Sequence, residues 1–442
     1  MNEIFENISK YLPENVTFKG LYLQSNPVYI KSPIYISKSS EIFPDTVKIR
    51  HFISISTDDD ITILGIEIFV YLQIYQDQID QYIFVSKCDT VGLSKVNFKV
   101  GSIIEKVVEF LINYDLTKYK IKQRKVKEDD KEDKSKEQKH ERKQGSETLF
   151  LINKVLEKLQ DPKFKIPYYS SSNHPTQPSE SLCQLPPIQN IKVCLFTKAA
   201  PQYLFPDSAK NPHKHVINGQ QLLKWWIPVI NNATSKWPIH KLAIPGSDDI
   251  STKKFIQGLP NWSIGHIFNT SGPAVYNIAL FPDDPKGRFL EHLIVENRYG
   301  NVGVDQFYEE LGYRQEFRLG DLVGLIGCEN RGVSIPAPGE QEDEDAITKL
   351  SVHQYKQFIN LIKSEDYHIE QDVKTLVGTK IPAFMKKNNI NFEYKPIKGK
   401  MPRTNATKPT QQAQTINTLT VKRKTNDLTG LIKRKKPESQ KS

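Results

Sequence analysis

The sequence predicts an α/β fold made of a single mixed domain. Apolar side chains recur with a period of two over residues 61–75, which is typical of a strand. Helical and strand-like segments then alternate along the chain, as expected for one mixed sheet with helices around it. A charged, Ser- and Pro-rich stretch over about 121–188 interrupts the alternation. We predict a long disordered insertion there, with a short helix near 147–160, because so few apolar residues cannot offset the entropy lost on ordering.

The strands are predicted first. Residues 61–75 are expected to form a central strand, because both of its alternating faces are largely apolar. Residues 82–85 are expected to form its neighbour, and the Asp and Gly residues of 88–92 to end that strand in a turn. Two further apolar runs, at 191–196 and 274–280, also predict strands.

The helices are recognised by their caps and their apolar spacing. Ser102 and Glu105 form the S-x-x-E pattern of a capping box, which predicts a helix over 102–114. Asn218 is expected to cap the helix that carries the Trp225-Trp226 pair. Further helices are predicted at 285–297, 304–312, 351–363 and 370–387.

The net charge of this 442-residue chain is +10, and it is confined to one end. Residues 391–442 contain 13 Lys+Arg and 3 Asp+Glu, so the remainder is electroneutral. We predict a disordered basic tail there. Its two clusters, 422–424 and 433–436, are typical of a bipartite nuclear-import signal or a nucleic-acid contact, and the same charges serve both. A solvating tail without a partner is the alternative, and a nuclear role is favoured.

Several protein classes are excluded by composition. No run reaches the ~18 apolar residues of a membrane span, and Met1–Lys10 lacks the apolar core of a signal peptide. No CxxC or Cys/His spacing predicts a disulfide framework or a zinc site, and the His213-Lys214-His215 pattern lacks a third ligand. The four cysteines are scattered at Cys88, Cys183, Cys194 and Cys328.

Two clusters carry candidate chemistry. Asp284 followed by Pro285 is a common helix start, and the pattern alone favours capping over catalysis. The adjacent carboxylates of Asp283 and Asp284 are also able to hold a metal or accept a proton. The turn at 88–92 and the helix start after Gly101 form a weak candidate for an anion site. The tryptophan pair is more often core, although one ring can line a groove.

Three stretches resemble one known family. They are 85–90, 195–226, and 274–286, which contains Leu280-Phe281-Pro282-Asp283-Asp284-Pro285-Lys286. They resemble the fungal histone acetyltransferase family called regulator of Ty transposition, which modifies lysine fifty-six of histone H3 and is related to the CBP-type acetyltransferases. The resemblance implies an acetyltransferase domain over 1–390, with a mixed sheet of about seven strands surrounded by helices, and a tail over 391–442.

The same resemblance implies the site. Acetyl-CoA is the expected cosubstrate, and no metal is expected. Asp284 is expected to accept the proton, with Asp283 beside it, Asp89 also catalytic, and Trp226 beside the substrate lysine. Lys286 is expected to be acetylated by the enzyme itself. The expected cofactor contacts are Cys88, Asp89, Thr90, Asn97, Phe98, Lys99, Val100, Gly101, Phe196, Ala200, His215, Val216, Ile217, Trp225 and Arg288. Of these, Arg288 is expected at the edge of the active site.

The sequence differs from the family pattern in two places, and the family also implies several partners. Cys88 stands where a relative carries alanine, which predicts a thiol open to alkylation, and residues 92–101 hold only Lys95 and Lys99 as cations. The family implies histone H3–H4 as substrate and two activating chaperones, one of the nucleosome-assembly-protein type and one of the anti-silencing-function type. It also implies a nuclear role in nucleosome assembly, DNA replication and repair, and transcription. The basic tail is expected to contact an acidic chaperone or its cargo, and direct DNA contact stays open.

The reaction would be aminolysis of a thioester. A lysine amine with a pKa of ~10.4 must lose a proton before it attacks, and a nearby carboxylate can accept that proton. A non-enzymatic chromatin or nucleic-acid-binding protein is the alternative. A metal-dependent nuclease built on Asp283 and Asp284 is a weaker one.

Overall fold

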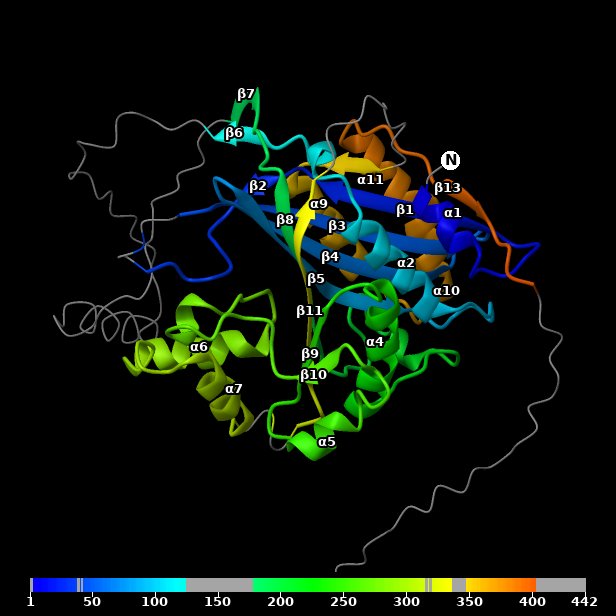
Figure 1. Ribbon diagram of the computed structural model, residues 1–442. Coiled ribbons are helices and arrows are strands. Elements are labelled where there is room, and N and C mark those ends of the chain that lie inside the picture. The colour runs from blue at the N-terminus through cyan, green and yellow to red at the C-terminus, as the bar shows by residue number, and fades with distance from the viewer. Residues whose placement is uncertain are drawn as a thin grey trace, which may run out of the picture. The chain divides into compact units, whose positions relative to one another are not determined.

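An eleven-stranded mixed sheet runs through residues 3–402 (Figure 1). The computed structural model describes residues 3–37, 40, 43–124, 178–314, 317, 320–335 and 347–402. The helix predicted near 147–160 and the basic clusters at 422–424 and 433–436 lie outside the described residues. The strand order is β10-β9-β11-β8-β5-β4-β3-β1-β12, with β13 also paired to β1 and β2 to β3. The expected count of about seven strands was therefore too low.

The strands divide into one large and one small sheet. The small sheet pairs β6 (Lys122–Arg124) with β7 (Pro178–Leu182). The strands of the large sheet are β1 (Thr17–Ser25), β2 (Val28–Tyr29), β3 (Asp45–Thr57), β4 (Thr62–Ile74), β5 (Gln78–Thr90), β8 (Ile188–Thr197), β9 (Ile239–Ala243), β10 (Trp262–Ile264), β11 (Gly324–Ser334), β12 (Thr348–Leu350) and β13 (Lys395–Lys398).

The central strand predicted at 61–75 is confirmed as β4, which pairs with β3 on one side and β5 on the other. The strand predicted at 191–196 is confirmed as β8. The turn predicted at 88–92 begins later than expected, because β5 stays paired with β4 as far as Leu64↔Thr90. Asp89 and Cys88 therefore belong to a strand.

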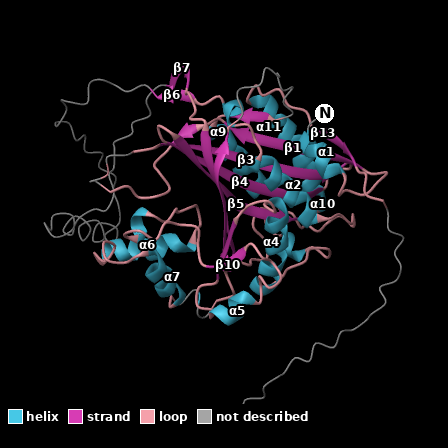
Figure 2. Ribbon diagram, viewed as in Figure 1, coloured by secondary structure: helices cyan, strands magenta, loops and turns pink. Residues whose placement is uncertain are grey.

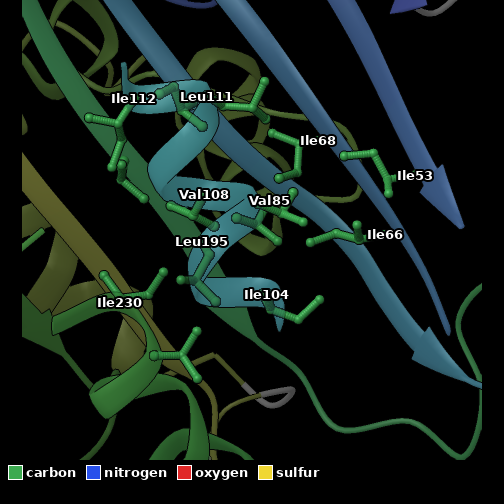
Figure 3. Close-up of a cluster of buried hydrophobic side chains, with 14 of the residues drawn as sticks. Ile53, Ile66, Ile68, Val85, Ile104, Val108, Leu111, Ile112, Leu195 and Ile230 are labelled. Carbon is green, nitrogen blue, oxygen red and sulfur yellow. The ribbon is translucent and has the colours of Figure 1, made fainter. Parts of the chain in front are cut away.

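Helices cover both faces of the sheet (Figure 2). On one face, β3–β5 and β8 pack against α1 (Glu3–Ser9), α2 (Val100–Ile112) and α4 (Gly219–Ala233). Figure 3 shows Ile104, Val108 and Leu111 of α2 beside Ile66 and Ile68 of β4. These residues form one continuous buried cluster.

The opposite face carries two further groups of helices. Phe52 packs with α9 (Val352–Lys363), α10 (Glu370–Thr375) and α11 (Ile381–Lys387), whereas its neighbour Ile53 packs in the first cluster. Because adjacent strand residues point to opposite faces, these helices lie across the sheet from α2. The second group is α6 (Pro285–Val295) and α7 (Val304–Gly312), which pack together. The described residues also form a short helix α5 (Asp249–Lys253).

The helix predicted over 370–387 is interrupted. A π-helical segment, Leu376–Lys380, separates α10 from α11, and Pro382 follows it. Proline has no N–H to donate, so the regular hydrogen-bond ladder changes at this point. The helices predicted at 304–312 and 351–363 are confirmed as α7 and α9.

The strand predicted at 274–280 was wrong. Residues Ala274–Tyr276 form a 3₁₀ helix, and its apolar side chains pack against α6 and α7. Asn277 donates its side-chain amide to the carbonyls of Ser271 and Pro273, which closes a compact turn. A buried loop can therefore have the same run of apolar residues as a buried strand, so the sequence pattern alone does not distinguish them.

The predicted caps had mixed outcomes. Asn218 forms a capping box with Gln221, and Asp284 caps α6, as expected. The capping box at Ser102 was wrong, because α2 already begins at Val100, so that Ser102 lies inside the helix. The N-cap residue Lys99 makes no side-chain hydrogen bond to the helix.

Both predicted boundaries also need correction. Residues 122–124 and 178–188 are strand or loop joined to the folded body, so only 125–177 of the expected insertion lies outside the described residues. The tail boundary at 391 was too early, because β13 pairs antiparallel with β1 and a bridge joins Met401 to Pro13. No described helix has the length and apolar content that crossing a membrane would need.

Candidate active site

A cavity opens where β5 and β8 part. The two parallel strands pair from Gln78↔Ile188 to Phe84↔Cys194 and no further. Beyond that point β5 follows β4 to Thr90, and β8 follows β11 to Thr197. The gap between them holds a cavity of about 360 Å³. Ligands commonly bind outside the carboxyl ends of parallel strands, so this position is typical of a substrate site.

Val100 of α2 and four further segments line this cavity, hereafter called the cofactor cavity because most of the expected cofactor contacts lie in it. The four segments are 85–90 of β5, residues of 195–203 at the end of β8, residues of the loop 214–217, and three residues of α4. Of the expected site residues, the structure brings together Cys88, Asp89, Thr90, Val100, Phe196, Ala200, His215, Ile217, Trp225 and Trp226.

Other expected residues do not line the cavity. Val216 is exposed, whereas Phe98 packs against the main core. Gly101 lies behind the wall, where a Cβ would come within 3.6 Å of the Trp225 Nε1. The cavity lining also lacks Asn97, Lys99, Arg288, Asp283, Asp284 and Lys286.

Five polar residues of the wall were not among the expected site residues: Ser86, Lys87, Lys198, Tyr203 and Lys214. Tyr203 falls within a stretch that carries the family resemblance, so a signal for it existed. Lys214 was considered only as part of the His213-Lys214-His215 pattern, as a spacer between two histidines. Its role depends on a contact with a strand 125 residues earlier, which local spacing does not reveal.

The Asp89 carboxylate organises the cavity wall. One oxygen, Oδ2, accepts hydrogen bonds from the backbone N–H groups of Tyr203 (2.7 Å), Leu204 (2.9 Å) and Phe205 (3.3 Å). The other, Oδ1, accepts from the Lys214 Nζ at 2.7 Å and from the Thr90 N–H at 3.0 Å. Five donors therefore surround this buried carboxylate, which holds the loop after β8 against the end of β5.

Lys214 completes this arrangement. Its Nζ also donates to Ser208 Oγ at 2.6 Å, and Ser208 Oγ donates to the Phe205 carbonyl at 2.6 Å. The chain comes very close to β5 at this point, because a Cβ at Gly92 would collide with the backbone nitrogen of Lys214. Only glycine fits there, and its φ of +77° is also one that other residues rarely adopt.

Two tryptophans form the apolar side of the cavity. The rings of Trp225 and Trp226 lie 4.9 Å apart between centroids and are nearly perpendicular, at 79°. Trp226 is buried and Trp225 is partly buried, and both line the cavity. The expectation that one ring packs inward is met, but the inward ring also reaches the site.

The two carboxylates of the 283–284 pair have different surroundings. Asp284 caps α6: its Oδ1 accepts from the Lys286 N–H (3.0 Å), and its Oδ2 accepts from the Lys286 Nζ (2.6 Å) and the Phe281 N–H (3.3 Å). Its side chain is fully buried. Asp283, by contrast, has a φ of +59° and a side chain that is 73% exposed.

Asp283 does not line the cavity itself, but it contacts Lys87, which does. Its carboxylate lies 3.4 Å from the Lys87 Nζ, and Lys87 lines the cavity. A small cavity of about 30 Å³, lined in part by Lys286 and Phe196, adjoins the cofactor cavity at Phe196. The three expected carboxylates therefore lie in the wall (Asp89), behind it (Asp284) and at the rim (Asp283).

Burial controls the ionisation of the wall. Burial, with a smaller contribution from the Asp89 charge, raises the pKa of the Cys88 thiol far above its ordinary value. The thiolate is the reactive form, so this direction argues against the expected alkylation. Burial also raises the pKa of Tyr203 to about 12. Its hydroxyl donates to the Lys198 carbonyl and accepts from the Ala200 N–H, each at 2.8 Å.

The part of the chain that the structure describes has no group of three or more His, Cys, Asp or Glu side chains arranged to hold a metal ion. The described polar side chains of the cofactor cavity are instead three lysines, a histidine, a tyrosine, a serine, a threonine, a cysteine and one carboxylate. Such a set suits an organic substrate with anionic and apolar parts.

Comparison with known proteins gives a consistent result. Residues 4–383 match the histone acetyltransferase KAT11-type domain. The chain is 46% identical over 368 residues to "Histone acetyltransferase RTT109" of Candida albicans, which covers 83% of this chain and 96% of that protein. It is 33% identical over 158 residues to "Histone acetyltransferase rtt109" of Schizosaccharomyces pombe, which covers 31% of this chain and 41% of that protein. In fold it is similar to the crystal structure of Rtt109 from Aspergillus fumigatus, with a TM-score of 0.64 at 20% identity, covering 91% of this chain and all of that one.

Proposed function

The chain belongs to the family of histone acetyltransferases with a KAT11-type domain, and from that premise we propose that it transfers an acetyl group from acetyl-CoA to lysine fifty-six of histone H3. Some N-terminal lysines of H3 are proposed as further targets. The proposal includes H3–H4 as the substrate, and nuclear roles in nucleosome assembly, DNA replication and repair, and transcription. Activation by the two chaperone types rests on the family resemblance.

The observation that carries the proposal is the cavity between the parted ends of β5 and β8. Its volume of about 360 Å³ falls in the usual range for an organic ligand. Trp225, Leu222 and Phe196 offer apolar walls for the pantetheine arm of acetyl-CoA. Exposed Lys198 at the wall suits a phosphate group, and Val100 at the start of α2 adds a further apolar side chain to the lining.

The surroundings of each carboxylate suggest its part in the reaction. The attacking lysine must lose a proton, and the acceptor needs a free lone pair within reach of the amine. Asp89 already accepts five hydrogen bonds and Asp284 three, one of them from Lys286. Asp283 is exposed at the rim, so we assign the proton acceptor to Asp283, which acts directly or through water. Asp89 and Asp284 then act as positioning residues.

The wall excludes water from the reacting atoms. Trp226 is buried, so its ring can hold the stem of the substrate lysine in an apolar environment. Such positioning lowers the entropy cost of bringing the amine and the thioester together. Lys87 lines the cavity, and its Nζ lies 3.4 Å from the Asp283 carboxylate, so it can hold that carboxylate at the cavity rim.

A transfer assay tests this function. Full-length protein, radiolabelled acetyl-CoA and recombinant H3–H4 would be combined with each chaperone, and the modified lysines located by mass spectrometry. We expect label on lysine fifty-six, and a large loss of rate in Trp226→Ala. Saturable quenching of tryptophan fluorescence by acetyl-CoA gives an independent readout of binding. Neither transfer nor quenching by the unmodified protein would overturn the proposal and favour the non-enzymatic alternative.

A further inference from the structure

One buried carboxylate in the central strand has no part in the mechanism described so far. Glu67 of β4 is only 5% exposed. Its neighbours Ile66 and Ile68 pack in the cluster with α2, so the Glu67 side chain points to the opposite face of the sheet, toward α9. Burying a charge is costly, and ionisable groups buried beside a cavity are often functional. Glu67 is therefore a candidate for a role in the reaction.

Two hydroxyl groups hold this carboxylate. The Tyr355 hydroxyl of α9 donates to Glu67 Oε1 at 3.2 Å, and the Ser86 hydroxyl of β5 donates to Oε2 at 3.4 Å. Burial outweighs the nearby positive charges and raises the pKa of Glu67. A raised pKa makes a carboxylate a better proton acceptor near neutral pH. The charged and titratable groups around Glu67 are Lys48, Arg50, Tyr71, Lys87, Tyr355 and Lys363.

Ser86 connects Glu67 to the cofactor cavity. The register of β4 and β5 shifts from Glu67↔Lys87 to Ile68↔Val85, which leaves Ser86 as the extra residue of a β-bulge. Bulges beside active sites often redirect a side chain. Ser86 lines the cofactor cavity, and no group among the described residues donates a hydrogen bond to its Oγ. A hydroxyl that donates its hydrogen to Glu67 therefore keeps its lone pairs for a donor in the cavity.

The reaction has a second proton that still lacks an acceptor. The substrate lysine arrives as an ammonium group with three protons on its nitrogen, whereas the amide product keeps one. Asp283, the proposed acceptor, takes the first proton before the attack. The second must leave once the nitrogen has bonded to the acetyl carbon. Ser86 is next to Lys87, whose Nζ lies 3.4 Å from the Asp283 carboxylate, so Ser86 adjoins the part of the cavity where the first proton leaves.

We propose that Glu67 takes this second proton through Ser86. The nitrogen of the tetrahedral intermediate gives a proton to the Ser86 Oγ, and Ser86 gives its own hydroxyl proton to the Glu67 Oε2. The C–S bond then breaks, and CoA leaves as the thiolate. Glu67 returns the proton by the same path to the sulfur, so that free CoA forms as the thiol and both side chains regain their starting state. The inference rests on the proposed function; it adds Ser86 as a catalytic residue and Glu67 as a positioning residue that acts through it.

Steady-state kinetics of the full-length protein with H3–H4 test this relay. Ser86→Ala removes the hydroxyl, and we expect kcat to fall about 10²-fold while the KM for acetyl-CoA stays within about twofold. Ser86→Thr keeps a hydroxyl at that position and should retain kcat within about threefold. The matched control, Ser54→Ala, removes a buried hydroxyl of β3 outside the cavity and should leave kcat unchanged.

The two residues of the relay should act as one unit. Glu67→Gln keeps the size of the side chain but cannot accept the proton, so its loss of kcat should match that of Ser86→Ala. The double variant should lose no more than either single variant, because both changes interrupt the same path. Melting temperatures show whether Glu67→Gln also perturbs folding, in which case the alanine and threonine variants of Ser86 still decide.

The outcomes separate the relay from the proposed function. A kcat of Ser86→Ala equal to that of the unmodified protein, or additive losses in the double variant, would overturn the relay and leave the function intact. Absence of acetyl transfer by the unmodified protein would overturn the function itself, and the relay with it.

Discussion

Lys214 donates a hydrogen bond of 2.7 Å to Asp89, and both side chains are at most 5% exposed in the wall of the cofactor cavity. This ion pair joins the loop that carries His215 to the strand that carries Cys88. The shape of the cavity thus depends on two charges that are themselves removed from solvent. Four predictions follow from this and related contacts.

Breaking the pair on one side should cost more than removing it altogether. Asp89→Asn and Lys214→Met each leave a buried charge without its partner, and we expect each to lower the free energy of unfolding by about 3–5 kcal/mol. The double variant should lose less than the sum of the two, because no charge is left unpaired. Urea denaturation measures the three losses, and strictly additive values would contradict a coupled pair.

The close approach at Gly92 gives a second prediction. Gly92→Ala adds a Cβ that collides with the Lys214 backbone at a φ of +77°. Gly258→Ala is the matched control, because its φ is +82° and no atom lies within 4 Å of the added Cβ. We expect the control to lose about 1 kcal/mol from its backbone conformation alone. Gly92→Ala should lose clearly more and also bind acetyl-CoA more weakly by fluorescence titration. Equal losses would show that the loop moves aside freely.

The neighbouring carboxylates should respond differently to substitution. Asp283→Asn should lower kcat about 10²-fold with little change in stability, since its side chain is exposed and the proton must go elsewhere. Asp284→Asn should chiefly destabilise the protein, because the buried Lys286 would lose its charged partner. Transfer rates and melting temperatures of both variants, measured side by side, check this. The reverse pattern would return the role of proton acceptor to Asp284.

His51 should make stability depend on pH. It lies buried between the hydroxyls of Tyr22 and Tyr119, and burial lowers the pKa of His51 to about 3. In the unfolded chain its pKa is about 6.5, so below that pH the unfolded state takes up a proton that the folded state excludes. Between pH 7 and pH 5 this group alone should remove about 2 kcal/mol of stability.

A difference between variants isolates that contribution. His51→Gln removes the buried imidazole, whereas His353→Gln removes an exposed one and serves as the control. Melting temperatures recorded from pH 7 to pH 5 should fall less steeply in His51→Gln than in the unmodified protein. An unchanged slope in that variant would mean that the buried ring is protonated in the folded state.

Sequence periodicity found the strands that are long and buried on both faces, such as β4. It failed for β9 and β10, because five and three residues are too few to show a period. It also failed at 274–280, where a buried loop has the composition of a strand. Local capping rules located the starts of α4 and α6 but not of α2, whose first turn is fixed by packing rather than by a side-chain cap.

The site was accessible to sequence reasoning only in part. The family resemblance named Asp89, Trp225 and Trp226, and the structure places all three around one cavity. It did not reveal that Asp89 is saturated by donors from a loop 114–125 residues away. Those contacts depend on the register of β5 against β8, which is set by the whole sheet. The carboxylate of Asp283 was likewise distinguished from that of Asp284 only by its exposure and by Lys87.

The pairing of β13 with β1 has a mechanical consequence. The antiparallel register sets Lys398 opposite Thr17 and Lys395 opposite Gly20, so the last residues of β13 face the first residues of β1. Tension that draws residues 3 and 402 apart therefore loads these hydrogen bonds one after another, as in unzipping, instead of together in shear. The pairing of β1 with β13 would therefore break at low force, starting at Thr17 and Lys398. The pairing of β1 with β3 on its other side would stay in register while β13 detaches.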